Sequence, residues 1–105
     1  MATNEVIQLL KKCLQLVRSE GIPVNKAFLF GSYARNQATD TSDIELMIVS
    51  DNPFENDDMT IGKIWSLTRK VSTKIEPYLV GNDRFNNDSN SPLIQTVKAE
   101  GIVIV

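Results

Sequence analysis

The spacing of apolar positions along the chain predicts a fold that combines helices with short strands. Apolar residues recur at steps of three and four in three segments, as in amphipathic helices; these segments are 4–19, 59–72 and 92–100. Short apolar runs between polar stretches are typical of strands; they are 26–30, 43–49, 74–80 and 102–105. A further short helix is expected from Ser32 to about Gln37. The predicted class is therefore α/β (α+β), with a small mixed sheet of about four strands packed by about four helices.

The connecting segments are expected to be loops because they are polar and rich in turn-forming residues. These segments are 36–42, 50–58 and 81–90. Pro77 cannot donate a ladder hydrogen bond, so its strand is expected at an edge of the sheet or to be locally irregular. Trp65 is expected to pack in the core or against the sheet rather than to stack on a base, and Leu93 is expected to face inward.

The length of 105 residues predicts one domain, residues 1–105. A net charge of −2 argues against direct nucleic-acid binding, which normally needs a basic face. No stretch approaches the roughly 20 apolar residues of a membrane span, and Lys11 and Lys12 interrupt any signal-peptide pattern. Cys13 is the single cysteine, so no internal disulfide can form, and a reducing cytoplasm is the expected compartment.

The chain contains no histidine, which limits the chemistry it can perform. A Ser-His-Asp triad, a histidine general base and a histidine-containing zinc site are all excluded. Catalysis would have to use carboxylates, hydroxyls, lysines or arginines. Carboxylate and hydroxyl oxygens favour hard cations such as Mg²⁺.

Gly31-Ser32 follows the first predicted strand and is the first candidate part of a site. Glycine lets the backbone bend and lets a ligand approach closely. A helix starting at Ser32 would offer free backbone N–H groups and a positive dipole end, which suit phosphate. Taken alone, a Gly-Ser strand exit is also a common plain turn.

Asp43 and Glu45 open the second predicted strand and are the second part. Residues two apart on a strand share a face, with Cα atoms roughly 6.5 to 7 Å apart. Two carboxylates so placed can hold one divalent ion, or two ions about 3.5 to 4 Å apart. An exposed acidic strand start explains the pair alone equally well.

Glu76, near the start of the third strand, completes the candidate site by topology. A short connection makes the first two strands antiparallel, so Gly31-Ser32 and Asp43 share one end of the sheet. The helix 59–72 makes a strand-helix-strand crossover, for which a right-handed connection is expected. The third strand then runs parallel to the second, and Glu76 reaches the same end.

These residues resemble the DNA polymerase β-like nucleotidyltransferase superfamily. The pattern is a hydrophobic residue with Gly-Ser, then an acidic-hydrophobic-acidic-hydrophobic run, then a distant third acid. The matching segments are Phe30-Gly31-Ser32, Asp43-Ile44-Glu45-Leu46 and Ile75-Glu76. The GSYAR segment and the small size are most similar to the minimal nucleotidyltransferases (the MNT family), which implies the nucleotidyltransferase fold. Asn36 stands where the family usually has glycine, and Glu45 and Glu76 stand where aspartate is common.

The resemblance implies transfer of a nucleoside monophosphate, AMP from ATP, to a hydroxyl acceptor with release of pyrophosphate. It implies a two-metal mechanism with two Mg²⁺ ions. The residues assigned to catalysis and to the metal ions are Asp43, Glu45 and Glu76. Gly31 and Ser32 would hold the β- and γ-phosphates. Arg35 is a candidate phosphate contact, although an exposed helical arginine is an equal alternative.

Because the chain is close to a catalytic core alone, a partner or a second copy in a homodimer is expected to complete the acceptor site. In the MNT family the partner is a helical HEPN-domain protein, and the pair forms a toxin-antitoxin system in which the MNT protein adenylylates the toxin. Two alternatives stay open: a binding protein of this fold that neutralises a partner by complex formation, and a small-molecule nucleotidyltransferase of the aminoglycoside type.

Overall fold

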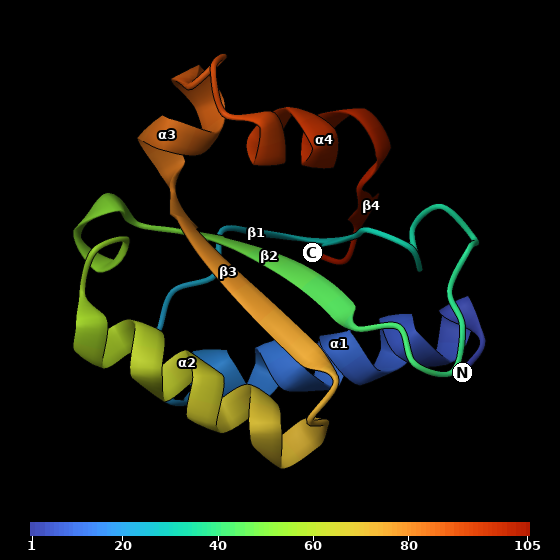
Figure 1. The fold of residues 1–105 in the computed structure, drawn as a ribbon. Helices are drawn as coiled ribbons and strands as arrows, with labels where there is room; N and C mark the ends of the chain where they lie inside the picture. The colour runs from blue at the N-terminus through green and yellow to red at the C-terminus, as the bar shows by residue number, and fades with distance from the viewer.

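The computed structural model describes residues Met1–Val105 and contains four helices, one 3₁₀ turn and four strands (Figure 1). The helices are α1 (Thr3–Ser19), α2 (Asp58–Val71), α3 (Asn82–Asn87) and α4 (Pro92–Glu100), and the 3₁₀ turn is η1 (Asn52–Phe54). The strands are β1 (Lys26–Phe30), β2 (Ile44–Ser50), β3 (Ile75–Gly81) and β4 (Ile102–Val103). The predicted α+β class is therefore confirmed.

The four strands form one mixed sheet in the order β3-β2-β1-β4. Strand β1 pairs antiparallel with both β2 and β4, whereas β2 and β3 are parallel. Helix α2 makes the crossover that the parallel pair requires. Strand β3 lies at an edge, as Pro77 predicted. The relative directions of β1, β2 and β3 are those that the sequence predicted.

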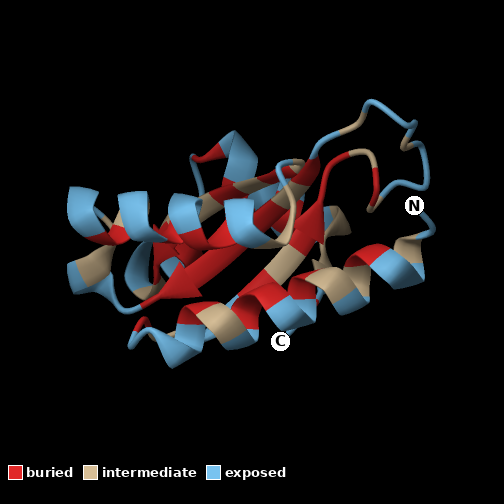
Figure 2. Cartoon of the chain, turned by 90° about the horizontal axis from the view of Figure 1, so that it is seen from below, coloured by how far each residue is buried: buried red, intermediate tan, exposed pale blue.

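Helices cover both faces of the sheet, with α1 and α2 on one side and α3 and α4 on the other (Figure 1). Alternate residues of β2 pack on the two faces of the sheet, because successive side chains of a strand point to opposite faces. Ile44, Leu46 and Ile48 pack in the core formed with α1 and α2, whereas Met47 and Val49 pack in the core formed with α3 and α4. Strand β2 is buried along nearly its whole length, whereas the edge strands β3 and β4 are partly exposed, as are the outer surfaces of the helices (Figure 2).

The sequence prediction was wrong for two segments. Residues 81–90 do not form a loop throughout, because Gly81 ends β3 and Asn82–Asn87 form α3. Helix α3 is held by a buried aromatic contact in which the Phe85 ring stacks on Phe28 at 5.2 Å. Conversely, Ser32 to Gln37 forms consecutive turns rather than a helix, and Asn36 there has a positive φ of 56°.

Two apolar side chains lie further outward than the sequence predicted. Trp65 is 36% exposed, and its ring lies 5.0 Å from the Arg69 guanidinium. Leu67 takes the inward position on α2 that was expected for Trp65. Leu93 is 37% exposed, because Ile94 and not Leu93 enters the core from α4.

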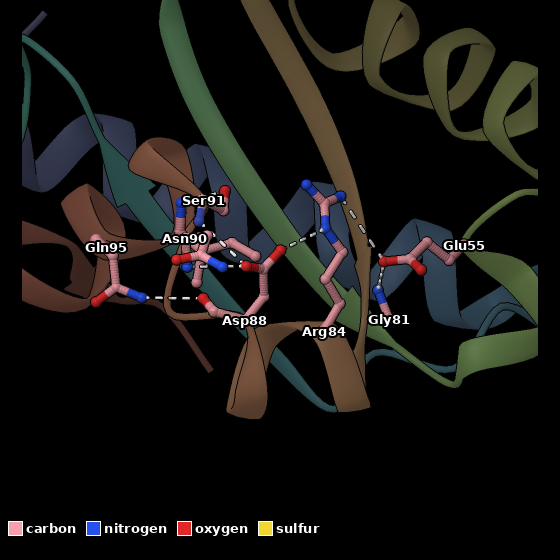
Figure 3. A network of polar contacts seen from close by, with 8 residues as sticks. Glu55, Gly81, Arg84, Asp88, Asn90, Ser91 and Gln95 are labelled. Carbon is pink, nitrogen blue, oxygen red and sulfur yellow. Dashed lines mark hydrogen bonds and ion pairs between the residues drawn. The ribbon is translucent and has the colours of Figure 1, made fainter.

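A polar network around Asp88 joins α3 to α4 (Figure 3). The Asp88 carboxylate accepts hydrogen bonds from the backbone N–H groups of Asn90 and Ser91, at 3.0 and 3.1 Å. It also accepts one from Arg84 Nε at 3.3 Å, and Gln95 donates to its backbone carbonyl. The Asn90 amide is the main reason why the pKa of Asp88 lies below its usual value. This network links the end of α3 to the start of α4.

No helix in the chain combines the length and the apolar character needed to cross a membrane.

Candidate active site

Phe30, Glu45 and Glu76 form one row across three neighbouring strands. Phe30 of β1 is the register partner of Glu45 of β2, and Glu45 is the partner of Glu76 of β3. Residues of one such row lie about 4.8 Å apart from strand to strand. By strand alternation the two glutamates share the face on which Phe30 and Met47 pack. The structure thus brings together the acids that the sequence placed at one end of the sheet.

Gly31 lies directly against the Glu45 carboxylate. A Cβ atom built on Gly31 would come within 1.6 Å of Glu45 Oε2 and 2.8 Å of its carboxyl carbon. Gly31 also has a φ of +79°, a backbone conformation that residues with a side chain rarely adopt. Two separate reasons therefore favour glycine at this position: the backbone conformation of the turn, and the space that the Glu45 carboxylate occupies.

Glu45 is an acid of the site whose pKa is shifted by its surroundings. Its pKa is raised above the usual glutamate value, first because burial penalises the charged form and next because of the negative charge of Glu76. The charge of Asp43 raises the pKa of Glu45 by a smaller amount, whereas the Arg35 cation lowers it. The cluster thus carries negative charge that Arg35 only partly balances.

Asp43 lies one residue before β2 and is exposed. The loop that leads to it is held by Lys74, whose ammonium group donates to the backbone carbonyl of Asp40 at 2.6 Å. Within the loop the Thr39 amide donates to the Ser42 hydroxyl at 2.8 Å. Lys74 is the residue before β3, so this contact ties the loop that carries Asp43 to the strand that carries Glu76.

The Gly31-Ser32 turn presents free backbone donors without being a helix. The amides of Arg35 and Gln37 bond back to the carbonyls of Gly31 and Ser32, at 3.1 and 2.9 Å. The three N–H groups from Ser32 to Ala34 make no hydrogen bond within the protein. Successive free amides in a turn are suited to an anion. The turn therefore offers the donors that were expected from a helix start.

Arg35 lies near the acids but is held from the side by α4. Its Nη1 atom is 2.9 Å from Glu100 Oε1, and its side chain is 43% exposed. Its Nε also donates to the Gln37 amide oxygen Oε1 at 3.4 Å. The guanidinium is therefore close enough to Glu45 to influence its pKa while remaining accessible to an incoming anion.

Tyr78 belongs to the site and was missed by the sequence interpretation. Its hydroxyl donates to Glu76 Oε2 at 3.3 Å, and its ring lies 5.4 Å from that of Phe30. Burial, followed by the charges of Glu76 and Glu45, raises its pKa. The available signal was the strand period of two, which places Tyr78 on the same face as Glu76.

Carboxylate oxygens are the kind of ligand that a hard divalent cation prefers. However, no group of three or more acidic or cysteine side chains in this structure is arranged so that it could hold a metal ion. All donors are carboxylate oxygens, which Mg²⁺ prefers. Burial first, and repulsion from Glu76 second, raise the pKa of Glu45, and a bound cation would relieve that repulsion. The assignment of Asp43, Glu45 and Glu76 as metal ligands stays a prediction.

Known proteins resemble this chain in both sequence and fold. The family model "Polymerase beta, Nucleotidyltransferase" matches residues 11–105. A protein from Methanocaldococcus jannaschii that is named as a protein adenylyltransferase is 35% identical over 81 residues, which cover 77% of this chain and 78% of that protein.

Two solved structures share the fold at low sequence identity. One, described as a nucleotidyltransferase from Sulfolobus solfataricus, superposes with a TM-score of 0.66 at 16% identity and covers 97% of this chain and 81% of that chain. The other belongs to a toxin-antitoxin structure with AMP-PNP, and it superposes with a TM-score of 0.64 at 17% identity over 90% of this chain and 72% of that chain.

The sequence match and the row of acids beside a Gly-Ser turn lead to the same assignment. The chain is an enzyme of the polymerase β nucleotidyltransferase family, with the fold of that family and features consistent with its MNT-type members.

Proposed function

We propose that this protein transfers AMP from ATP to a hydroxyl group of a partner protein and releases pyrophosphate. The observation that carries the proposal is the row in which Glu45 lies between the Gly31 turn and Glu76. This row supports a phosphate-binding site at the Gly31-Ser32 turn beside the acids, within a single domain of residues 1–105. The 35% identical protein named as a protein adenylyltransferase supports AMP and a protein as the transferred group and acceptor.

Each part of the site has a distinct role in this reaction. The free amides from Ser32 to Ala34 would bind the β- and γ-phosphates, with Gly31 allowing their close approach. Arg35 would turn toward the same phosphates. Glu76, at the edge strand, would face the acceptor and take the proton of its hydroxyl.

Asp43, Glu45 and Glu76 would hold two Mg²⁺ ions. When bound, these ions supply charge neutralisation at the triphosphate and activation of the acceptor hydroxyl. The acids would hold these ions at the end of the sheet that also carries the Gly31-Ser32 turn.

A helical HEPN-type partner would bring the acceptor, in a toxin-antitoxin pair. The toxin-antitoxin structure with AMP-PNP, which shares this fold, supports both the nucleotide and the existence of a partner. A homodimer would supply the missing acceptor surface from a second copy instead. We place the reaction in the cytoplasm, where Cys13 stays reduced and Mg-ATP is available.

Isothermal calorimetry with Mg²⁺ and a non-hydrolysable ATP analogue tests nucleotide binding, and transfer of labelled AMP to proteins of a lysate tests the reaction. We expect Asp43→Ala to abolish transfer. Asp40→Ala is the matched control, because Asp40 is an exposed acid of the same loop whose contact to Lys74 uses only its backbone carbonyl. Transfer that survives Asp43→Ala would refute the metal assignment.

The alternative, a binding protein that neutralises a partner by complex formation, predicts a different outcome. The complex would then form with equal affinity for the Asp43→Ala and unaltered chains, and no AMP would appear on the partner. The absence of nucleotide binding with Mg²⁺ or Mn²⁺, even with the partner present, would decide in favour of this alternative.

A further inference from the structure

Tyr78 is the only residue whose side-chain hydroxyl contacts one of the three acids of the site. It lies on β3 two positions after Glu76, so both side chains are on the face covered by α3 and α4. The hydroxyl donates to Glu76 Oε2 at 3.3 Å. Glu76 lies on an edge strand and is half-buried, and no other side chain bonds to its carboxylate. The Tyr78 hydroxyl is therefore the one side-chain group that restrains this carboxylate through a hydrogen bond.

Packing fixes the position of the Tyr78 ring, and thereby that of its hydroxyl. The ring lies 5.4 Å from the Phe30 ring at an interplanar angle of 59°. This tilted arrangement is one that aromatic pairs favour. Phe30 is buried and directly precedes Gly31. The aromatic pair therefore connects the strand that leads into the phosphate-binding turn with the strand that carries Glu76.

A glutamate has three rotatable bonds, and ordering such a side chain costs up to about 1.5–2 kcal/mol of conformational entropy. A hydrogen bond from a rigid donor offsets this cost before any ligand arrives. One bond to Oε2 leaves most of the roughly four lone-pair sites of the carboxylate free for other partners. The contact can thus orient Glu76 without blocking it.

We propose that Tyr78 is a positioning residue of the transfer site, which holds the Glu76 carboxylate in the orientation that a divalent cation and the acceptor hydroxyl require. This inference rests on the proposed function. Tyr78 does not touch the nucleotide in this scheme, and it acts through Glu76 alone. Removal of its hydroxyl should therefore weaken cation binding and turnover more than ATP binding.

The test compares Tyr78→Phe with the unaltered chain. The variant keeps the ring contact with Phe30 and loses only the hydroxyl. Mn²⁺ binding without nucleotide is measured by electron paramagnetic resonance, AMP transfer is measured as kcat and KM for ATP, and thermal unfolding is measured without metal. We expect Mn²⁺ affinity and kcat to fall by about 10- to 100-fold, as for other residues that orient a metal ligand, with KM for ATP unchanged.

A matched double variant separates positioning from a general structural role. In a Glu76→Gln background, Tyr78→Phe should cause no further loss of Mn²⁺ affinity or of kcat. Equal losses in both backgrounds would overturn the proposal, as would a Tyr78→Phe chain that binds Mn²⁺ and transfers AMP like the unaltered protein. AMP found on Tyr78 itself would also overturn it, because the hydroxyl would then be an acceptor. Failure of the unaltered chain in these assays would overturn the proposed function and this inference together.

Discussion

Replacing Gly31 with alanine should separate the folding role of this glycine from its role in the site. Gly31 has a φ of +79°, and Gly21, in the turn after α1, has a φ of +83°. Alanine in this conformation costs about 1–2 kcal/mol. Nothing lies within 4 Å of a Cβ atom on Gly21, whereas a Cβ atom on Gly31 would be 1.6 Å from Glu45 Oε2. Gly21→Ala is therefore a control that carries the backbone strain alone.

The added clash at Gly31 should affect function much more than stability. The Glu45 carboxylate must retreat from 1.6 Å to at least 3.0 Å, and it can do so because it is the far end of a flexible side chain. We therefore expect both alanine variants to lose about 1–2 kcal/mol, or roughly 4–16 °C in Tm. Only Gly31→Ala should lose divalent-cation affinity, by about 10-fold or more, because it displaces a proposed ligand.

Thermal unfolding and Mn²⁺ binding, measured on the same preparations, check both expectations. In a Glu45→Ala background, Gly31→Ala should still cost the backbone strain and should have no further effect on Mn²⁺ binding. The reasoning is refuted if Gly31→Ala binds Mn²⁺ as tightly as Gly21→Ala. It is also refuted if Gly31→Ala leaves the Tm unchanged, since the positive φ would then impose no constraint.

Three further substitutions give distinct outcomes. Glu45→Gln should stabilise the protein at neutral pH, because the native pKa of Glu45 is raised and folding therefore disfavours its charged form. Thermal unfolding measured against pH follows this gain in stability. The gain should vanish as the pH falls below the unfolded pKa of about 4.3. Asp88→Asn should destabilise the protein at neutral pH. The variant should match the stability of the unaltered chain once the pH falls through the lowered native pKa of Asp88, because the Asp88 carboxylate stabilises the fold only when it is charged. Chemical unfolding at several pH values measures this difference. Glu100→Gln should change stability by less than ~1 kcal/mol, since its ion pair with Arg35 is exposed, and added salt should remove the difference.

The sequence was sufficient to place the acids because topology follows from few rules. A short connection made β1 and β2 antiparallel, and the crossover helix made β2 and β3 parallel. Once both directions are known, Glu45 and Glu76 must share one end of the sheet. The register that makes them direct neighbours could not be predicted, because it depends on how the strands pack against both helix layers.

The errors arose where tertiary contacts outweigh local pattern. Residues 82–87 are polar enough to predict a loop, and they form α3 because Phe85 stacks on Phe28, which is distant in sequence. Trp65 matches the inward spacing of α2, but Leu67 is buried in its place, whereas Thr68 is buried as predicted. Tyr78 was missed because its role depends on two contacts, with Phe30 and with Glu76, that no sequence spacing reveals.

The two glutamates that replace the more common aspartates each have a neighbour that compensates for their length. A longer acid reaches further but has one more rotatable bond to restrain. Glu45 lies against Gly31, where the missing side chain provides the space that its carboxylate occupies. Glu76 is held by the Tyr78 hydroxyl, and Phe30, the residue before Gly31, packs against the same tyrosine ring. These contacts form one connected unit, in which Gly31 leaves room for the Glu45 carboxylate and Tyr78 holds that of Glu76.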